Sequence, residues 1–187
     1  MQSYKDFKKE YLNEWVDRSQ VARKAAEELA MKEVKPSLRD RYKPQNVIMT
    51  LDGKQVEFKG ENEKNPNDLE YNFFTYDEAI KLFEKPDLKD GWRLPTKEEL
   101  EALCEYPYEF DEVSKQGIFD RRLYLPAMGL RGCSGNVIFV GSEGYYWSST
   151  PNGSDTACDF YIHSYRAGVS YGNRNDGQSV RLVRDVK

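Results

Sequence analysis

The side chains that could perform nucleophilic chemistry in this chain are Cys104, Cys133, Cys158 and a single histidine, His163. A thiolate activated by an imidazole base is the arrangement of a cysteine-dependent enzyme, and Cys133 or Cys158 with His163 is the pair available for it. A thiol beside glycine, as Cys133 is beside Gly132, more often serves as a small packing residue. We therefore expect no catalytic residues and a protein that is not an enzyme, and a thiol-dependent enzyme is the third alternative.

Sequence motifs for nucleotides, cofactors and metals are absent from the chain. It contains no GxGxxG fingerprint, no P-loop and no HExxH motif, and Ser134 lacks the GxSxG context of a hydrolase nucleophile. One histidine cannot build a multi-histidine metal site, and three separated cysteines without a CxxC pair predict neither a zinc site nor a disulfide framework. We expect no cofactor, no metal and three reduced, mostly buried thiols, with a disulfide between Cys133 and Cys158 as the open alternative.

The overall composition argues against two further kinds of partner. The formal net charge is -4 and the isoelectric point is near 5.3, whereas nonspecific nucleic-acid binding needs a basic surface. No stretch approaches the roughly 18 consecutive apolar residues of a membrane span, and no apolar signal-peptide core follows Met1. We expect no nucleic-acid partner, no membrane insertion, no signal peptide and a protein that is cytoplasmic where it is made.

Residues 141–180 differ in composition from the rest of the chain. They contain five tyrosines, seven serines, six glycines and three asparagines among 40 positions, and no lysine. Antibody paratopes have this composition, because rigid amphipathic rings supply contact area and small polar residues supply adaptable hydrogen bonds. The composition predicts a ligand-binding surface. The alternative is that tyrosine and serine simply suit a solvated antiparallel sheet.

A two-residue period assigns faces within residues 157–164. Cys158, Phe160 and Ile162 fall on one face, which predicts core. The residues that alternate with them, from Asp159 to His163, predict an exposed polar and aromatic row that neighbouring turns extend. The predicted ligand-binding residues are Tyr145, Asp155, Asp159, Tyr161, His163, Tyr165, Arg166, Ser170, Tyr171, Asn173 and Asn175.

Helices and short strands must position these residues. The predicted order is a helix over 4–32, a hairpin over 47–58, helices over 76–83 and 97–104, and short strands from residue 123 onward. Asp52-Gly53 predicts a type I′ turn, Thr75 predicts an N-cap, and Thr96 with Glu99 predicts a capping box. Because no βαβ rhythm occurs, we predict an α+β fold with short antiparallel strands, two packed helices and an N-terminal helix.

Residues 1–45 form a segment with its own pattern. Apolar residues recur at intervals of three or four between Tyr4 and Lys32, and Pro36 ends the pattern. This stripe predicts either a helix that packs on its own domain or a helix that assembles a homo-oligomer through residues 4–32.

Four motifs occur in order in the second half of the chain: GWRLPTKEEL over 91–100, LPAMG over 125–129, GYYWSST over 144–150 and GQSVRLVR over 177–184. Together they resemble the Fibrobacter succinogenes major paralogous (FISUMP) domain family, which is similar to the C-type lectin and formylglycine-generating-enzyme folds. The resemblance covers roughly 70–187 and implies a C-type-lectin-like domain over 46–187, with its ligand-binding segment at 145–176. It makes the motif residues scaffold: Trp92 and Trp147 as core anchors, Arg93 and Arg181 as links to backbone carbonyls, and Ser148, Ser149 and Thr150 as a turn closed by side chains.

The chain lacks the sequence patterns of two groups of proteins with these folds, the calcium-dependent lectins and the formylglycine-generating enzymes. Calcium-dependent sugar-binding lectins carry Glu-Pro-Asn or Gln-Pro-Asp and a following Trp-Asn-Asp run, and neither occurs here. The resemblance therefore implies calcium-independent binding. Cys133 and Cys158 do not match the context of the paired active-site cysteines of formylglycine-generating enzymes, so it implies no catalysis.

The tyrosine-rich stretch between residues 150 and 179 also resembles the variable proteins of diversity-generating retroelements, in which adenine-directed mutagenesis changes chosen codons. This resemblance implies a receptor-recognition protein with a protein or cell-surface ligand, a glycan included, assembled into a phage particle or a surface structure. The alternative is a structural or adhesin-type FISUMP domain of a phage or bacterial surface assembly, without diversification.

Overall fold

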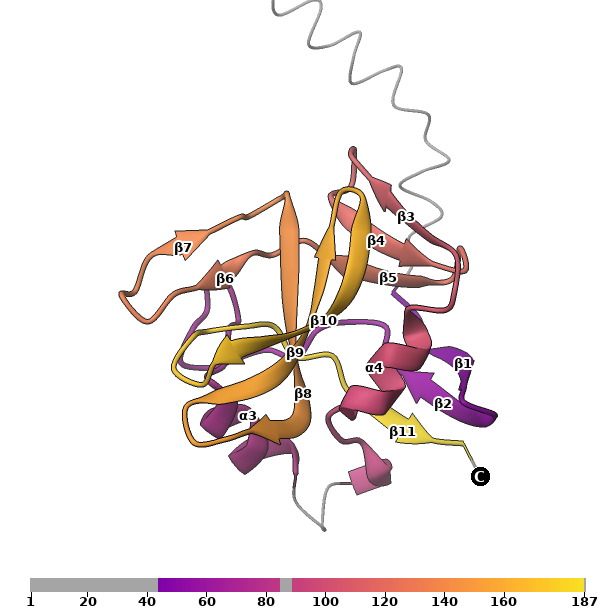
Figure 1. Ribbon diagram of the computed structural model, residues 1–187, viewed down its shortest axis with the longest axis horizontal. Helices are drawn as coiled ribbons and strands as arrows, with labels where there is room; N and C mark the ends of the chain where they lie inside the picture. Colours follow the sequence, from indigo (N-terminus) through magenta and orange to yellow (C-terminus); the bar gives the residue numbers. More distant parts are fainter. Residues whose placement is uncertain (1–43, 85–88, 187) are drawn as a thin grey trace, which may run out of the picture. The chain divides into compact units, whose positions relative to one another are not determined.

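The computed structural model describes residues 44–84 and 89–186, which belong to the unit Pro44–Lys187. The predicted helix over 4–32, and both roles considered for it, lie outside the described residues. The described part is an α+β fold of short antiparallel strands with two α-helices, which confirms the predicted class (Figure 1). None of its helices is long and apolar enough to cross a bilayer.

The first hairpin follows directly from its sequence. Strands β1 (Val47–Leu51) and β2 (Lys54–Phe58) pair antiparallel, and Asp52 and Gly53 between them have φ values of 48° and 75°. Two successive left-handed residues make a type I′ turn, so the predicted hairpin is confirmed. Strand β11 (Val183–Asp185) pairs with the other edge of β2 and completes a three-stranded sheet.

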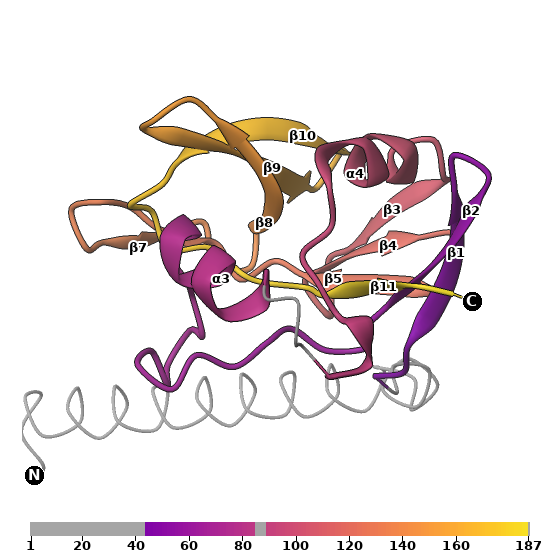
Figure 2. The ribbon, with the colours of Figure 1, turned by 90° about the horizontal axis from the view of Figure 1, so that it is seen from below.

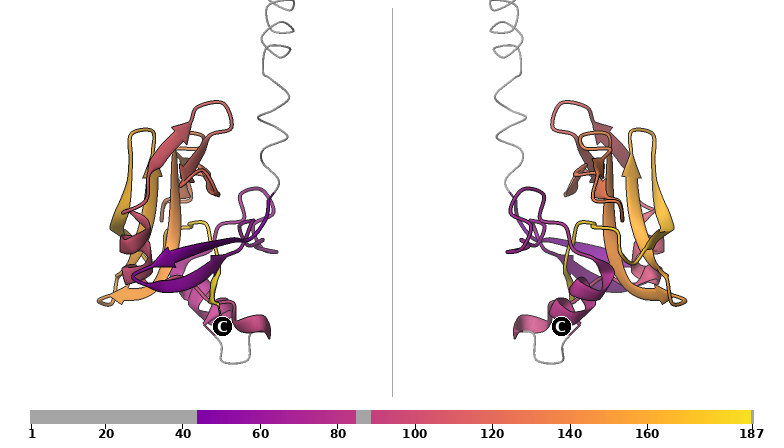
Figure 3. Two further views of the ribbon diagram at one scale, coloured as in Figure 1. Left: turned by 90° about the vertical axis from the view of Figure 1, so that its right-hand side faces the viewer. Right: turned by 90° about the vertical axis from the view of Figure 1, so that its left-hand side faces the viewer.

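A second three-stranded sheet contains most of the predicted binding residues. Its strands are β8 (Glu143–Asn152), β9 (Thr156–His163) and β10 (Arg166–Asn173), in the order β10-β9-β8 and antiparallel throughout. The β9–β10 turn therefore lies at one end of the sheet and the β8–β9 turn at the other. In the side views of Figure 3 these strands run upright and the β1–β2 hairpin runs across them.

The remaining elements connect these two sheets. They are α3 (Tyr76–Phe83), the 3₁₀ turn η1 (Lys89–Gly91), α4 (Lys97–Leu103), the sheet of β3 (Tyr108–Asp111), β4 (Gln116–Phe119) and β5 (Leu123–Pro126), and the pair β6 (Leu130–Arg131) and β7 (Val137–Ile138). The sequence pattern did not predict β3 and β4. All four residues of β4 are buried, so this strand lacks the two-residue alternation by which a half-exposed strand is recognised.

Both α-helices begin at capping boxes. The Thr75 side chain accepts a hydrogen bond from the backbone N–H of Glu78, whose carboxylate accepts from the backbone N–H of Thr75. Thr96 and Glu99 make the same reciprocal pair at the start of α4, as predicted. Figure 2 shows α4 between the β8–β10 sheet and the β1–β2 hairpin, and both α3 and α4 contact β8.

Trp147 anchors the smaller of two hydrophobic clusters. Its side chain is fully buried, its indole N–H donates to the carbonyl of Phe74 at 2.8 Å, and its ring meets Tyr76 edge to face. The core-anchor prediction is confirmed for Trp147. Trp92 is partly exposed at the edge of this cluster, where the Arg184 guanidinium lies 4.6 Å from its ring centroid, so the same prediction holds only in part.

The two motif arginines bind different kinds of acceptor. Arg181 is buried and donates to the backbone carbonyl of Lys59 at 2.9 Å, which confirms the predicted link to backbone. Arg93 donates mainly to carboxylates, those of Glu99 and Asp185, each at 2.6 Å from Nη2. These bonds tie the start of α4 to β11, two segments far apart in the sequence.

Ser148, Ser149 and Thr150 bond side chains to backbone as predicted, but they lie within strand β8 and the predicted turn is wrong. Buried Ser148 donates to the carbonyl of Cys158 at 2.8 Å and accepts from the backbone N–H of Thr150 at 3.1 Å. Thr150 accepts from the backbone N–H of Lys97 at 3.0 Å, which fixes the first turn of α4 against β8. The segment coincides with a register shift between β8 and β9, so its side chains replace ladder hydrogen bonds.

Candidate functional site

Strand register assembles a polar and aromatic surface at one end of the β8–β10 sheet. Tyr145 on β8 lies opposite Tyr161 on β9, which lies opposite Gly168 on β10. The next row toward the β9–β10 turn consists of Glu143, His163 and Arg166. Directly opposed residues project from the same side of a sheet. We use the name tyrosine face for the side chains of Glu143, Tyr145, Tyr161, His163, Tyr165 and Arg166.

Glu143 holds two neighbours of the tyrosine face in place. Its carboxylate accepts a hydrogen bond from the Tyr145 hydroxyl, and its other oxygen lies 3.3 Å from Nε2 of His163. Burial and the adjacent carboxylate both raise the pKa of Tyr145, so this hydroxyl stays protonated and acts as a donor. Glu143 is not among the predicted ligand-binding residues. Its position two residues before Tyr145 on one strand nevertheless places both on the same face.

Tyr161 lies across β10 because its partner is a glycine. A Cβ atom at Gly168 would stand 2.9 Å from the Tyr161 hydroxyl and 3.1 Å from ring carbons. Those distances are shorter than ordinary van der Waals contact, so any larger residue would push the ring away. The ring is half-buried and presents one side to solvent.

Tyr165 and Arg166 form the exposed part of the tyrosine face. Tyr165 is 71% exposed, and its ring centroid lies 4.2 Å from that of His163. The Arg166 guanidinium lies 5.3 Å from the ring of Tyr161 and 5.7 Å from the ring of Tyr165. Cation–π contact with two rings orients the guanidinium while its N–H groups remain open to solvent.

An apolar segment borders the tyrosine face. Ile138, Phe139 and Val140 are 43%, 45% and 55% exposed, and the Phe139 ring lies 6.4 Å from that of Tyr145. Phe139 has a φ of 65°, which turns the chain between β7 and β8. The sequence pattern assigned these residues to a strand, and a run of consecutive apolar residues normally predicts burial, so the sequence carried no signal of their exposure.

The burial of Asp159 contradicts the prediction that it belongs to an exposed row along β9. Its side chain is 2% exposed and accepts a hydrogen bond from the buried amide of Gln178 at 2.8 Å. Burial raises the pKa of Asp159 to about 6. The prediction that Asp159 faces solvent is wrong, because its cross-strand neighbour Trp147 belongs to the buried cluster around α3.

The predicted binding residues of β10 divide between the two sides of the sheet. Ser170 lies opposite Asp159 and is half-buried. Tyr171 lies opposite the core residue Cys158, and its ring faces α4, where Nζ of Lys97 is 6.0 Å from its centroid. Asn173 shares that side by alternation and is exposed at the end of β10. The prediction that Tyr171 and Asn173 share one surface with Tyr161 and His163 is therefore wrong.

Asp155 and Asn175 lie at the far end of the sheet. Asp155 is in the β8–β9 turn, and its carbonyl accepts from the backbone N–H of Arg174, which pairs with Asp77 of α3. Six residues of extended strand separate Asp155 from Tyr161, roughly 20 Å at 3.3 Å per residue. The residues that the structure does bring together are thus Tyr145, Tyr161, His163, Tyr165 and Arg166.

The three cysteines are free thiols, so the Cys133–Cys158 bridge is not formed. The expectation that they are mostly buried is wrong, because Cys104 and Cys133 are exposed. Cys133 is exposed in the turn between β6 and β7, whereas Cys158 is buried on the core side of β9 and burial raises its pKa. His163 projects from the opposite side of β9 and contacts Glu143 and Ser164. The structure does not place Cys158 and His163 together.

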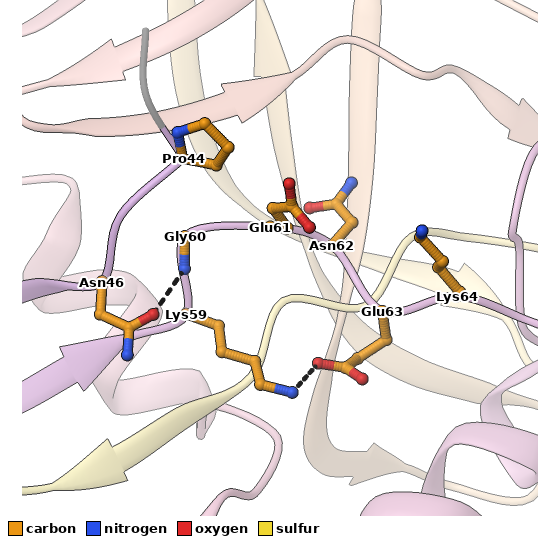
Figure 4. A pocket seen from close by; sticks show the side chains of 8 residues that line it. All are labelled: Pro44, Asn46, Lys59, Gly60, Glu61, Asn62, Glu63 and Lys64. Carbon is orange, nitrogen blue, oxygen red and sulfur yellow. Dashed lines mark hydrogen bonds and ion pairs between the residues drawn. The ribbon is translucent and has the colours of Figure 1, made fainter.

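A polar hollow lies elsewhere on the surface. It encloses about 470 Å³ and is lined by Pro44, Asn46 and residues 59–64 (Figure 4). Inside it, Lys59 pairs with Glu63 at 2.6 Å and Asn46 accepts from the backbone N–H of Gly60 at 3.0 Å. Because these groups satisfy each other, the tyrosine face is the better candidate for ligand binding.

Comparison with known protein families gave a match over most of the described residues. The model of one family, the Lcl C-terminal domain, matches residues 61–184, which include all four motifs and the tyrosine face. That family is linked to variable proteins of the FISUMP and diversity-generating-retroelement type. Neither the curated proteins nor the solved structures contained a match. The chain belongs to the Lcl C-terminal domain family.

Proposed function

We propose that this protein is a ligand-binding, receptor-recognition protein that engages its ligand through the tyrosine face, without a catalytic step, cofactor or metal. The observation that supports this most is the stacking of Arg166 on Tyr161 and Tyr165, two rings that stay partly or largely exposed. Tyrosine and arginine are enriched in binding hot spots, and tyrosine supplies a large contact area at a small entropic cost.

The fixed orientation of its side chains favours a binding role for the tyrosine face over a purely structural role. Tyr161 is held between Gly168 and Arg166, and Tyr145 and His163 are held by Glu143. Side chains that are already oriented lose little freedom when a partner arrives, so more of the contact energy appears as affinity.

Family membership supports ligand binding or surface recognition in general. We further propose the finer assignments: a C-type-lectin-like scaffold, calcium-independent recognition of a protein or cell-surface ligand, and a variable protein of the diversity-generating-retroelement type. Its place would be a phage particle or a bacterial surface structure. A template repeat that differs from this gene at adenines, beside a reverse transcriptase gene, would support diversification, and its absence would favour an ordinary FISUMP domain.

Tyrosine substitutions test the proposed surface. We expect Tyr165→Ala and Tyr161→Ala to abolish binding of the full chain to peptides selected on it from a yeast-displayed random library. We expect the melting temperature to change little, since both rings are on the surface side of the sheet. Tyr171→Ala is the matched control, because Tyr171 is 51% exposed on the other side of the same sheet and should keep full binding.

Three outcomes would contradict the proposal. Unchanged peptide binding by the Tyr161 and Tyr165 variants would remove the tyrosine face from recognition. A large loss of stability in both variants would make these rings structural residues of the fold. Loss of binding in the Tyr171 variant alone would move the site to the α4 side of the sheet.

A further inference from the structure

Arg166 lacks the ion pair with a carboxylate that five other arginines of the described residues form. Five arginines form ion pairs with carboxylates: Arg93, Arg122, Arg131, Arg174 and Arg184. Within residues 44–84 and 89–186, no carboxylate lies within 4.0 Å of the Arg166 guanidinium, which contacts two tyrosine rings instead. Glu143, the carboxylate of the tyrosine face, is engaged by Tyr145 and His163. Among these residues the Arg166 guanidinium therefore has no ion-pair partner, and it shares the face with the carboxylate of Glu143.

The two rings prepare this guanidinium for a specific kind of ligand. The guanidinium contacts the rings of Tyr161 and Tyr165 and donates no hydrogen bond to another described residue, so its N–H donors are available to a ligand. A carboxylate matches that edge, because its two oxygens accept two parallel hydrogen bonds. Neighbouring aromatic surface excludes water and strengthens such a bond relative to one in bulk solvent.

The 138–140 segment indicates which class of molecule bears the carboxylate. Phe139 is continuous with the tyrosine face through Tyr145, and Ile138 and Val140 extend the apolar surface beyond it. Aliphatic side chains match the apolar side chains of a protein, whereas they would strip water from sugar hydroxyls without offering hydrogen bonds in return.

We propose that Arg166 binds an aspartate or glutamate side chain of a protein ligand, whose adjacent apolar residues cover Ile138, Phe139 and Val140. This inference rests on the proposed function and names the ligand class for the same surface. The acidic side chain is the anchor at the centre, and the apolar contact lies to one side of it, over the β7–β8 connection.

The experiment selects peptides on the full-length protein from the yeast-displayed random library and then exchanges single residues on both partners. We expect enrichment of Asp or Glu next to large apolar residues. Replacing that acidic residue by its amide should weaken binding to the wild-type protein about tenfold or more, and by less than about twofold to Arg166→Gln. Arg121→Gln is the charge-matched control, because Arg121 is exposed in the β4–β5 turn, and it should bind like the wild type.

The outcomes separate this inference from the proposed function. Peptides that need Tyr161 but lose nothing with Arg166→Gln would overturn the carboxylate site and leave the tyrosine face as the binding surface. Peptides that need neither residue would overturn both. Binding of sialic-acid- or uronic-acid-terminated oligosaccharides that depends on Arg166, without acidic enrichment among peptides, would replace the protein ligand by a glycan and overturn the inference as stated.

Discussion

Replacing Asp159 by asparagine should stabilise the protein at neutral pH. The Asp159 carboxyl group is buried between β9 and the C-terminal segment, and one of its oxygens accepts a hydrogen bond from Gln178. The other oxygen, Oδ1, and the Oε1 atom of Gln178 are both buried without a hydrogen-bond partner. Two acceptors that lack a donor are unfavourable, and a negative charge in the same place is more so.

The expected change in the free energy of unfolding follows from the pKa of Asp159. Burial raises the pKa of Asp159 from 3.8 to about 6, and the hydrogen bond from Gln178 offsets only part of that increase. A difference of about 2 pH units corresponds to about 3 kcal/mol between the charged and neutral forms. Because the folded state binds this proton more tightly than the unfolded state, the stabilising contribution is complete below about pH 4 and is lost as the pH rises through about 6.

Asparagine keeps the shape of the side chain and removes the charge. Its carbonyl can accept from Gln178 as before, and its amide group replaces the unpaired Oδ1 of the carboxylate without a charge. We expect the free energy of unfolding of Asp159→Asn to exceed that of the wild type by roughly 1–3 kcal/mol near pH 7. Near pH 4, where the wild-type carboxyl group is already neutral in the folded state, the difference should shrink toward zero.

Urea unfolding followed by tryptophan fluorescence measures this, with wild type and variant compared near pH 4 and near pH 7. Asp155→Asn is the matched control, because Asp155 is exposed in the β8–β9 turn and its replacement should not change stability in a pH-dependent way. A variant that is less stable than wild type near pH 7, or a difference that does not depend on pH, would refute the reasoning about Asp159.

Two further predictions concern packing and the thiols. Gly172→Ala should destabilise the fold by roughly 1–3 kcal/mol in the same urea assay, because a Cβ atom there would overlap the Gln178 amide and lie 3.1 Å from Trp147; wild-type stability would show that this part of the core can adjust. Cys133 should react with a thiol reagent in the native protein, whereas Cys158 should react only after unfolding, as followed by mass spectrometry of digested peptides; rapid native labelling of Cys158 would contradict its burial.

Local patterns explain which elements were predictable. The β1–β2 hairpin depends on two adjacent residues, Asp52 and Gly53, that tolerate a left-handed backbone, and both helices depend on Thr and Glu three residues apart. These interactions close within a few residues, so the pattern predicts them without knowledge of the rest of the chain. Strand β4 was missed because it is buried on both sides, which erases the two-residue period.

The candidate site was predictable in composition and only in part in arrangement. The alternation along β9 correctly separates Phe160 and Ile162 from Tyr161 and His163. It could not show that α3 and Trp147 cover one end of the polar side, which buries Asp159. The cover comes from residues distant in the sequence, and alternation carries no information about them.

The sequence by itself determined the α+β class, the hairpin, the helix caps and the presence of a tyrosine-rich segment, because each depends on neighbouring residues or on composition. Tertiary structure decided the membership of the tyrosine face. Strand register placed Glu143 beside His163 and Tyr145 beside Tyr161, and it placed Tyr171 opposite Cys158 on the other side of the sheet. A sheet has two sides and several possible neighbours for each, so only the pairing of distant strands determines which side chains meet.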